Sequence, residues 1–432
     1  MPHLRSRQPA AWGDSLSPPR TALPAKGVDW ETLRARMQAL GEGDADWRSA
    51  RTAVYIFNAG EDVSRVARDA YAMYQAENAL GPLAFPSLAR MEAEVVEMGL
   101  GLLHGPEDAC GNLTSGGTES ILLAVKTCRD QAAAAGRNVA GAGVVVPASA
   151  HLAFDKACHY LGLRIHRVPL AADRRADPDA MAAAVDDETL MLVGSAPCFP
   201  YGLIDPIEAL SDLALQRGLW LHVDACVGGY FAPFARMNGV DVPPFDFELP
   251  GVASISADLH KYGYAAKGAS TIFHRDPDQR AFQVFESADW PAGLMKTPTA
   301  AGTRPGGAVA SAWAVLHYLG VEGYREKTRL VCETRARMME AIDAMPDLRT
   351  YGAPQLGLFL FGSETLDPFQ VYGRMLARGW FSGVVTEPRA IHQMLSPAHA
   401  GVVDEYIADL AEAVAEVRTG KAPTDSARPR YS

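Results

Sequence analysis

Short apolar runs alternate with helix-like stretches over the middle of the chain, from about residue 110 to 275. Near-continuous apolar runs of this length are typical of buried strands, and helical spacing of apolar residues marks the stretches between them. The predicted strands are 144–146, 163–168, 190–194, 219–223, 252–256 and 270–273. The predicted helices are 118–135, 152–161, 177–185 and 206–217. This alternation predicts an α/β domain with a large, mostly parallel sheet covered by helices on both faces.

The regions on either side are mainly helical. Periodic apolar positions predict helices near 29–41, 61–76 and 88–104, before the α/β region. After residue 305 come two long helical stretches, a strand at 356–361 and helices near 368–378 and 402–418. We therefore expect a flexible arm (1–27), an N-terminal helical segment (28–105), a large cofactor-binding domain (106–305), a smaller C-terminal α/β domain (306–420) and a disordered tail (421–432) rich in Pro, Ser, Thr and Arg.

Composition narrows the class of protein. The chain has 432 residues, of which 48% are hydrophobic and 21% charged, as in ordinary globular proteins. The net charge of -11 argues against a nucleic-acid partner, which calls for a basic surface. No apolar run reaches the roughly 18 residues of a membrane span, and the polar start of the chain does not resemble a secretory signal. The six cysteines lack metal-site spacing, so we expect reduced thiols, no metal and a cytoplasmic location.

Lys261 is the most informative residue of the chain. It follows the predicted strand 252–256 and precedes the small-residue stretch 267–273, so it would point from a loop into the interior. Lysine is rarely fully buried without a partner. Its stem can lie on apolar surface with the ammonium group in water, which is the ordinary interpretation. Alternatively, its amine forms a Schiff base with an aldehyde, and pyridoxal phosphate is the usual aldehyde.

A glycine-containing stretch supports the second interpretation. Residues 112–120 include Gly116, Gly117 and Thr118 and run into a predicted helix. Glycines allow a ligand to approach the backbone closely, and the start of a helix offers free N–H groups to an anion such as a phosphate. Without other signals the same stretch would be an ordinary turn with a helix cap.

Asp224 and His151 also follow predicted strands. Asp224 is either a helix cap or the carboxylate that keeps a pyridine nitrogen protonated, so that the ring accepts electrons. His151 is either an ordinary residue at the start of a helix or an imidazole lying on the cofactor ring. Because the glycine stretch, His151, Asp224 and Lys261 all lie at strand-to-helix turns, they are expected at one edge of the sheet. Together they predict pyridoxal 5'-phosphate as the cofactor.

Several blocks of sequence resemble the group II pyridoxal-phosphate decarboxylase family and, within it, the sphingosine-1-phosphate lyases. The resemblance is dense over about residues 85–325. Its blocks include TSGGTESILLAVKTCRD (114–130), AHLAFDKACHYLG (150–162), WLHVDACVGGY (220–230), PPFDFELPGVASISADLHKYGYAAKG (243–268) and DWPAGLMKTPTAAGTRPGG (289–307). It implies pyridoxal-phosphate fold type I, like that of aspartate aminotransferase, and a homodimer with shared active sites.

The resemblance also implies roles in binding the cofactor. Lys261 would form the Schiff base, Asp224 would face the pyridine nitrogen and His151 would stack on the ring. The phosphate would be held by Gly116, Gly117, Thr118 and His260, and by Thr303 from the partner subunit.

Further positions would face the substrate, a small-molecule amine. Lys267 and Tyr55 would assist proton transfer or hold the substrate phosphate, and Asn78 would lie in the same pocket. Two positions depart from the family: Gly81 and Tyr201 stand where the lyases usually have histidine. Without these two histidines, the site lacks cationic or donor groups near the substrate, so the identity of the substrate stays open.

The expected function is carbon–carbon cleavage by a retro-aldol reaction. The substrate would be a phosphorylated long-chain 2-amino-3-hydroxy compound such as sphingosine 1-phosphate, cleaved to an aldehyde and phosphoethanolamine. One alternative is an amino-acid decarboxylase, in which Lys267 or Arg304 would bind the substrate carboxylate. Another is a pyridoxal-phosphate-binding protein without turnover, although the presence of Lys261 and Asp224 argues against it.

Overall fold

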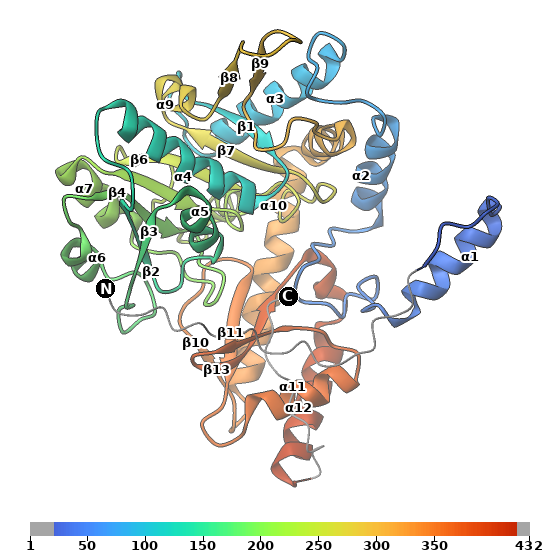
Figure 1. Cartoon of the computed structure of the whole chain (residues 1–432). Helices are drawn as coiled ribbons and strands as arrows, with labels where there is room; N and C mark the ends of the chain where they lie inside the picture. The colour runs from blue at the N-terminus through green and yellow to red at the C-terminus, as the bar shows by residue number, and fades with distance from the viewer. Residues whose placement is uncertain (1–20, 421–432) are drawn as a thin grey trace. The chain divides into compact units, whose positions relative to one another are not determined.

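The computed structural model describes residues 21–420, which fall into two compact units divided between Asp44 and Ala45 (Figure 1). The first unit holds helix α1 (Trp30–Leu40) and the short 3-10 helix η1 (Gly41–Gly43). Asp29 caps α1 by accepting the N–H of Thr32 at 2.9 Å. The tail predicted at 421–432 and most of the arm predicted at 1–27 lie outside the described residues.

A seven-stranded sheet organises the second unit. Its strand order is β1 (Cys110–Thr114), β7 (Ser270–His274), β6 (Val252–Ala257), β5 (Trp220–Asp224), β4 (Thr189–Ser195), β2 (Gly143–Pro147) and β3 (Arg164–Val168). β7 runs in the opposite direction to the other six strands, which all run in the same direction and therefore end at the same edge of the sheet. The mostly parallel sheet is confirmed. The sequence analysis did not predict β1, whose first two residues are a cysteine and a glycine.

Helices follow the strands and cover the sheet. They are α4 (Gly117–Ala134), α5 (Ala153–Leu161), α6 (Pro178–Ala184), α7 (Ile207–Arg217), α8 (Ala232–Met237) and α9 (Pro277–Ala281). Every residue of β2, β4, β5 and β6 is buried, as expected for strands covered on both faces. The four helices predicted between the strands are confirmed to within two residues at each end.

The N-terminal helices pack on a long helix of the C-terminal part. α2 (Glu61–Met73) and α3 (Pro86–Leu102) contact α10 (Gly306–Asp343), which consists of two helices joined by a kink at Gly320 (φ 54°). The two helical stretches predicted after residue 305 therefore follow each other directly and meet at this kink. The domain boundaries at 105 and 305 stay predictions.

A second, antiparallel sheet forms most of the remaining chain. Its order is β10 (Arg349–Tyr351), β11 (Leu358–Gly362), β13 (Arg389–Met394) and β12 (Gly383–Thr386). It is accompanied by α11 (Pro368–Ala377), the 3-10 helix η2 (Pro397–Gly401) and α12 (Val403–Arg418), while β8 (Phe285–Ser287) and β9 (Met295–Thr297) form a separate hairpin. Of the second sheet, only β11 was predicted from sequence.

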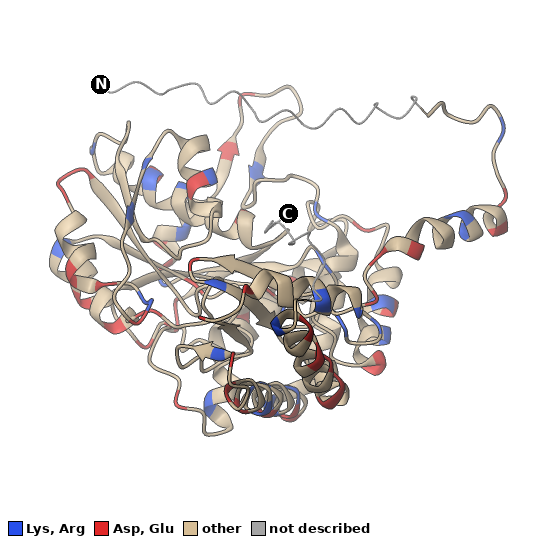
Figure 2. Ribbon diagram, turned by 90° about the horizontal axis from the view of Figure 1, so that it is seen from below, with Lys and Arg blue, Asp and Glu red and all other residues tan. Residues whose placement is uncertain are grey.

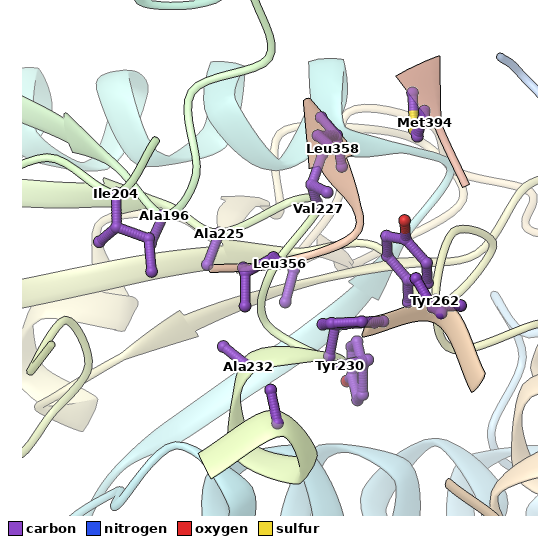
Figure 3. Packing of buried hydrophobic residues seen from close by; sticks show 14 of the residues in the cluster. Ala196, Ile204, Ala225, Val227, Tyr230, Ala232, Tyr262, Leu356, Leu358 and Met394 are labelled. Atoms are coloured by element: carbon purple, nitrogen blue, oxygen red, sulfur yellow. The ribbon is translucent and has the colours of Figure 1, made fainter. Parts of the chain in front are cut away.

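One hydrophobic cluster joins the two sheets. Figure 3 shows Leu358 and Met394 of the second sheet, and Leu356 just before β11, near residues that follow β5, among them Ala225, Val227 and Tyr230, and near Tyr262. These side chains are all buried. The second sheet therefore closes over the edge at which β5 and β6 end.

Charged residues of both signs are interspersed along the helices and loops of the second unit (Figure 2). Within residues 21–420, no helix has both the length and the apolar character needed to cross a bilayer.

Candidate active site

A cavity of about 510 Å³ lies at the edge of the large sheet where its parallel strands end. This volume is typical of small-molecule sites. Nine of the residues predicted from sequence line it, namely Tyr55, Gly116, Gly117, Thr118, His151, Asp224, His260, Lys261 and Lys267. The topology therefore brings together residues that are up to 212 positions apart in the chain.

The start of α4 forms one wall of this cavity. A Cβ atom on Gly117 would lie 2.7 Å from Sγ of Cys226 and 3.0 Å from the carboxylate of Asp258, so only glycine fits there. The first N–H groups of a helix have no acceptor within the helix, and its dipole favours a negative charge. The N–H groups of Gly117 and Thr118 can therefore bind an anion such as a phosphate.

Glu119 fixes the loop that precedes this helix. Its Oε2 accepts the N–H of Ser115 at 2.6 Å, and its Oε1 accepts the N–H of Ala300 at 2.8 Å. The carboxylate thus joins the glycine loop to the segment that leads to Thr303. The sequence analysis missed this role, although an acid in the first turn of a helix was a signal for it.

Lys261 forms an ion pair with Asp258, another residue that the sequence analysis missed. Nζ lies 2.9 Å from Oδ2 of Asp258, which is buried. Burial alone would lower the pKa of Lys261, but the attraction of Asp258 outweighs it and the pKa is raised. Oδ1 of Asp258 and Nδ1 of His260 are enclosed and have no hydrogen-bond partner among residues 21–420. Such groups call for a polar ligand in the cavity.

Asp224 is the last residue of β5, and His151 follows β2, which is separated from β5 by β4. Oδ1 of Asp224 accepts hydrogen bonds from the N–H of Cys226 (3.1 Å) and the hydroxyl of Ser256 (3.4 Å), which leaves Oδ2 available to a ligand. Nδ1 of His151 accepts the N–H of Ala153 at 3.1 Å, so Nε2 carries the ring proton. Burial lowers the pKa of His151, and its ring is neutral at pH 7.

Lys267 and Tyr55 close the other side of the cavity. Nζ of Lys267 donates to the backbone oxygens of Tyr55 (2.9 Å) and His260 (3.2 Å) and lies 5.4 Å from the ring centroid of Phe57. The side chain is open to the cavity, yet burial of Nζ and repulsion by Lys261 lower its pKa to about 8. Lys267 is therefore a cation at neutral pH that loses its charge under mildly alkaline conditions.

A second cavity, of about 450 Å³, adjoins the first and shares Tyr55, His151 and Phe199 with it. Its other walls are mostly apolar and come from Val54, Leu152, Pro200 and the residues of β12. Tyr201 lines this second cavity instead of the first, and its hydroxyl donates to the backbone oxygen of Glu387 at 2.9 Å.

The second cavity carries little charge. Burial lowers the pKa of His392 to about 4 and raises that of Tyr201, so both are neutral at pH 7. Among the described residues that line it, Glu387 is the only acidic one, and none is a lysine or an arginine. The cavity therefore suits an apolar group and disfavours a phosphate.

Asn78, Thr303 and Arg304 form a separate cluster outside both cavities. Nδ2 of Asn78 donates to Oγ1 of Thr303 at 3.2 Å, and Oδ1 of Asn78 accepts the N–H of Arg304 at 3.2 Å. The guanidinium of Arg304 is largely buried and pairs with Glu92 at 2.7 Å. Within one chain these residues do not reach the main cavity, and their roles stay predictions.

Comparisons with known proteins agree with this geometry. Residues 20–362 match the family model of the pyridoxal-dependent decarboxylase conserved domain. The chain is 44% identical over 344 residues to sphingosine-1-phosphate lyase of Arabidopsis thaliana. The matched region covers 78% of this chain and 63% of that protein. The chain thus spans less than two thirds of that relative's length.

Solved structures show the same fold. The structure of Burkholderia pseudomallei sphingosine-1-phosphate lyase superposes with a TM-score of 0.89 at 38% identity, over 93% of this chain and 94% of that one. Glutamate decarboxylase of Lactobacillus brevis, at 20% identity, has a TM-score of 0.81 over 92% of this chain and 95% of that one, which concerns the fold alone. The predicted α/β architecture of fold type I and the pyridoxal phosphate cofactor are confirmed.

Proposed function

We propose that this chain, which belongs to the pyridoxal-dependent decarboxylase family, is a lyase that cleaves a phosphorylated long-chain 2-amino-3-hydroxy compound such as sphingosine 1-phosphate. The products would be an aldehyde and phosphoethanolamine. The observation that carries the proposal is the junction of two cavities, one with the cations Lys261 and Lys267 and the other almost uncharged. A substrate with an anionic head and an apolar chain matches that junction.

The residues of the first cavity fit pyridoxal phosphate. Lys261 would bind it covalently, the N–H groups of Gly117 and Thr118 would hold its phosphate, and Asp224 would keep its ring nitrogen protonated. When bound, the cofactor withdraws electrons from a bond at Cα of an amine substrate. His151, which is neutral, would lie on the ring without adding a second positive charge.

The remaining polar residues would act on the substrate. Lys267 donates two hydrogen bonds through Nζ and, although its pKa is lowered to about 8, it is protonated at pH 7 and would attract the substrate phosphate. Tyr55 lines both cavities and is a candidate to assist the transfer of the hydroxyl proton when the bond between Cα and Cβ breaks. Lys261, once released, would return a proton to Cα.

The decarboxylase alternative has less support. It needs a cation beside the substrate carboxylate, and Arg304 is paired with Glu92 outside the main cavity. Lys267 is then the cation that could bind the substrate carboxylate in a decarboxylase.

A product screen by mass spectrometry separates these functions. Purified protein with pyridoxal phosphate would be incubated with sphingosine 1-phosphate, its unphosphorylated form and a panel of amino acids, and the Lys261→Ala variant would serve as the control. Release of a fatty aldehyde with phosphoethanolamine supports the lyase, whereas release of carbon dioxide from an amino acid would replace it with the decarboxylase. No product from any amine would favour a binding protein without turnover.

We also propose a cytoplasmic homodimer in which Asn78 and Thr303 of one chain complete the active site of the other. Their place outside the chain's own cavity supports this arrangement. Mixing inactive Lys261→Ala protein with inactive Thr303→Asp protein tests it, because mixed dimers would contain one intact site. If both variants are inactive alone and the mixture shows no regain of activity, the sites are not shared.

A further inference from the structure

Asp258 and Lys261 face each other within one turn after β6. Oδ2 of Asp258 and Nζ of Lys261 are 2.9 Å apart, and the Asp258 side chain is 2% exposed. The N–H of Asp258 donates to the oxygen of Cys226 (3.2 Å), and the N–H of Lys261 donates to the oxygen of Asp258 (3.3 Å). The backbone therefore holds the two side chains opposite each other.

No other group is as well placed to compensate the Asp258 carboxylate, and a carboxylate buried this deeply needs a cation. The titratable neighbours include His260, whose Nε2 is 3.7 Å from Oδ2, and also His151, Lys267, Asp224, Cys226 and Tyr230. Burial lowers the pKa of both histidines and raises the pKa of Cys226 and Tyr230, so all four are neutral at pH 7. Lys267 is bound to backbone oxygens instead.

We propose that Asp258 is a positioning residue that holds the amine of Lys261 as an ammonium ion whenever a substrate amine has taken its place on the cofactor. This proposal rests on the proposed role of Lys261 as the lysine that binds pyridoxal phosphate. An ammonium ion has no free electron pair, so Lys261 held in this way does not attack and expel the substrate. Asp258 thus favours the substrate-bound state of the enzyme.

The exchange balances without another reactant. The carbon–nitrogen double bond of the protonated Schiff base to Nζ of Lys261 breaks and both of its electron pairs go to Nζ, while the substrate nitrogen forms the double bond to the same carbon. The substrate enters as an ammonium ion; two of its protons pass to the two electron pairs on Nζ, and the third stays on the new protonated Schiff base. Lys261 therefore leaves as an ammonium ion beside the Asp258 carboxylate.

Uptake of pyridoxal phosphate by the cofactor-free full-length protein tests the proposal without any substrate. Attachment requires the uncharged amine of Lys261, so the wild-type rate should rise about tenfold per pH unit, with no plateau below about pH 9. Asp258→Asn keeps the shape and removes the charge. At pH 8 this variant should take up the cofactor at least about tenfold faster, because a larger fraction of Lys261 is uncharged.

Asp246→Asn is the matched control. Asp246 is also fully buried and pairs with His104 (3.0 Å) and Arg236 (3.8 Å), and it does not line the cavity. Its variant should lose stability and keep the wild-type dependence of uptake on pH. Melting temperatures of both variants show whether each is folded.

Two results would overturn the proposal: a wild-type rate and pH profile in folded Asp258→Asn protein, or a plateau below pH 9 in the wild type. The second result can still overturn the proposal if the variant does not fold. A failure of the proposed function looks different, because Lys261→Ala protein would then take up the cofactor with the same visible absorbance as the wild type.

Discussion

Nζ of Lys267 lies 2.9 Å from the backbone oxygen of Tyr55, which ties the loop after β6 to the chain segment before α2. The two residues close the same side of the main cavity and both line it. Because the ammonium group is enclosed there and close to Lys261, its pKa is lowered to about 8. Lys267 therefore changes charge within the range of pH that an activity assay covers.

This lowered pKa predicts how activity depends on pH. Lys267 is protonated below about pH 8 and loses its charge as the pH rises through that value, so binding of an anionic substrate weakens above it. We expect kcat/KM for a phosphorylated substrate to fall by up to about tenfold per pH unit above pH 8. Lys267→Met should abolish this fall and lower kcat/KM at pH 7 by about ten- to a hundredfold.

An unphosphorylated analogue is the control for that profile, because it has no phosphate for Lys267 to attract. Its kcat/KM should not show the fall near pH 8. A fall that persists unchanged in Lys267→Met would contradict the role of Lys267, and so would activity in the wild type that rises through pH 8.

Lys261→Ala should abolish turnover and the visible absorbance of the bound cofactor, because the covalent link is lost. The absorption spectrum of purified protein and a product assay check both results. Lys126→Ala is a suitable control, since Nζ of Lys126 binds the backbone oxygen of Phe282 and Asp130 away from the cavity. Retention of both the absorbance and the activity in Lys261→Ala would show that another residue binds the cofactor.

Asp224→Ala should lower kcat by about a thousandfold or more while the covalent link to the cofactor is kept, because the charge beside the ring nitrogen is removed. Single-turnover assays with spectroscopic measurement of bound cofactor separate the two effects. Asp205→Asn is the matched control: Asp205 is buried and accepts the N–H groups of Ala176 and Ser195, but does not line the cavity. Near-normal turnover of Asp224→Ala would refute the proposed role.

Much of the cofactor side of the site was predictable from the sequence. Parallel strands end at one edge of a sheet, so residues that follow apolar runs, such as His151, Asp224 and Lys261, had to lie near one another. The glycine at position 117 already indicated a close approach of other groups to the backbone. In the structure its surroundings leave no room for a Cβ atom.

The residues that act through contacts distant in sequence were harder to predict. Glu119 binds the backbone of Ala300, and nothing in the sequence places those two residues together. The second cavity depends on β12, a short and partly exposed strand with no strong apolar pattern. Arg304 was a candidate for binding a carboxylate, and only the structure shows its ion pair with Glu92.

Leu152 offers a test of the second cavity that should not disturb the fold. Its side chain is 66% exposed, it lines that cavity, and it occupies the N-cap position of α5. Because the side chain is exposed, Leu152→Asp should fold normally. It would add a negative charge to the wall that we propose contacts the apolar chain of the substrate. Leu152→Asp should therefore raise KM for a long-chain substrate by about tenfold or more.

A substrate shortened to a few carbon atoms distinguishes an effect on the second cavity from an effect on catalysis. Such a substrate does not reach Leu152, so Leu152→Asp should leave its kcat and KM unchanged. Tyr160→Asp is the matched control, because Tyr160 is similarly exposed on the same helix and does not line the second cavity. If Leu152→Asp changes KM equally for long and short substrates, or for neither, the apolar chain does not bind in the second cavity.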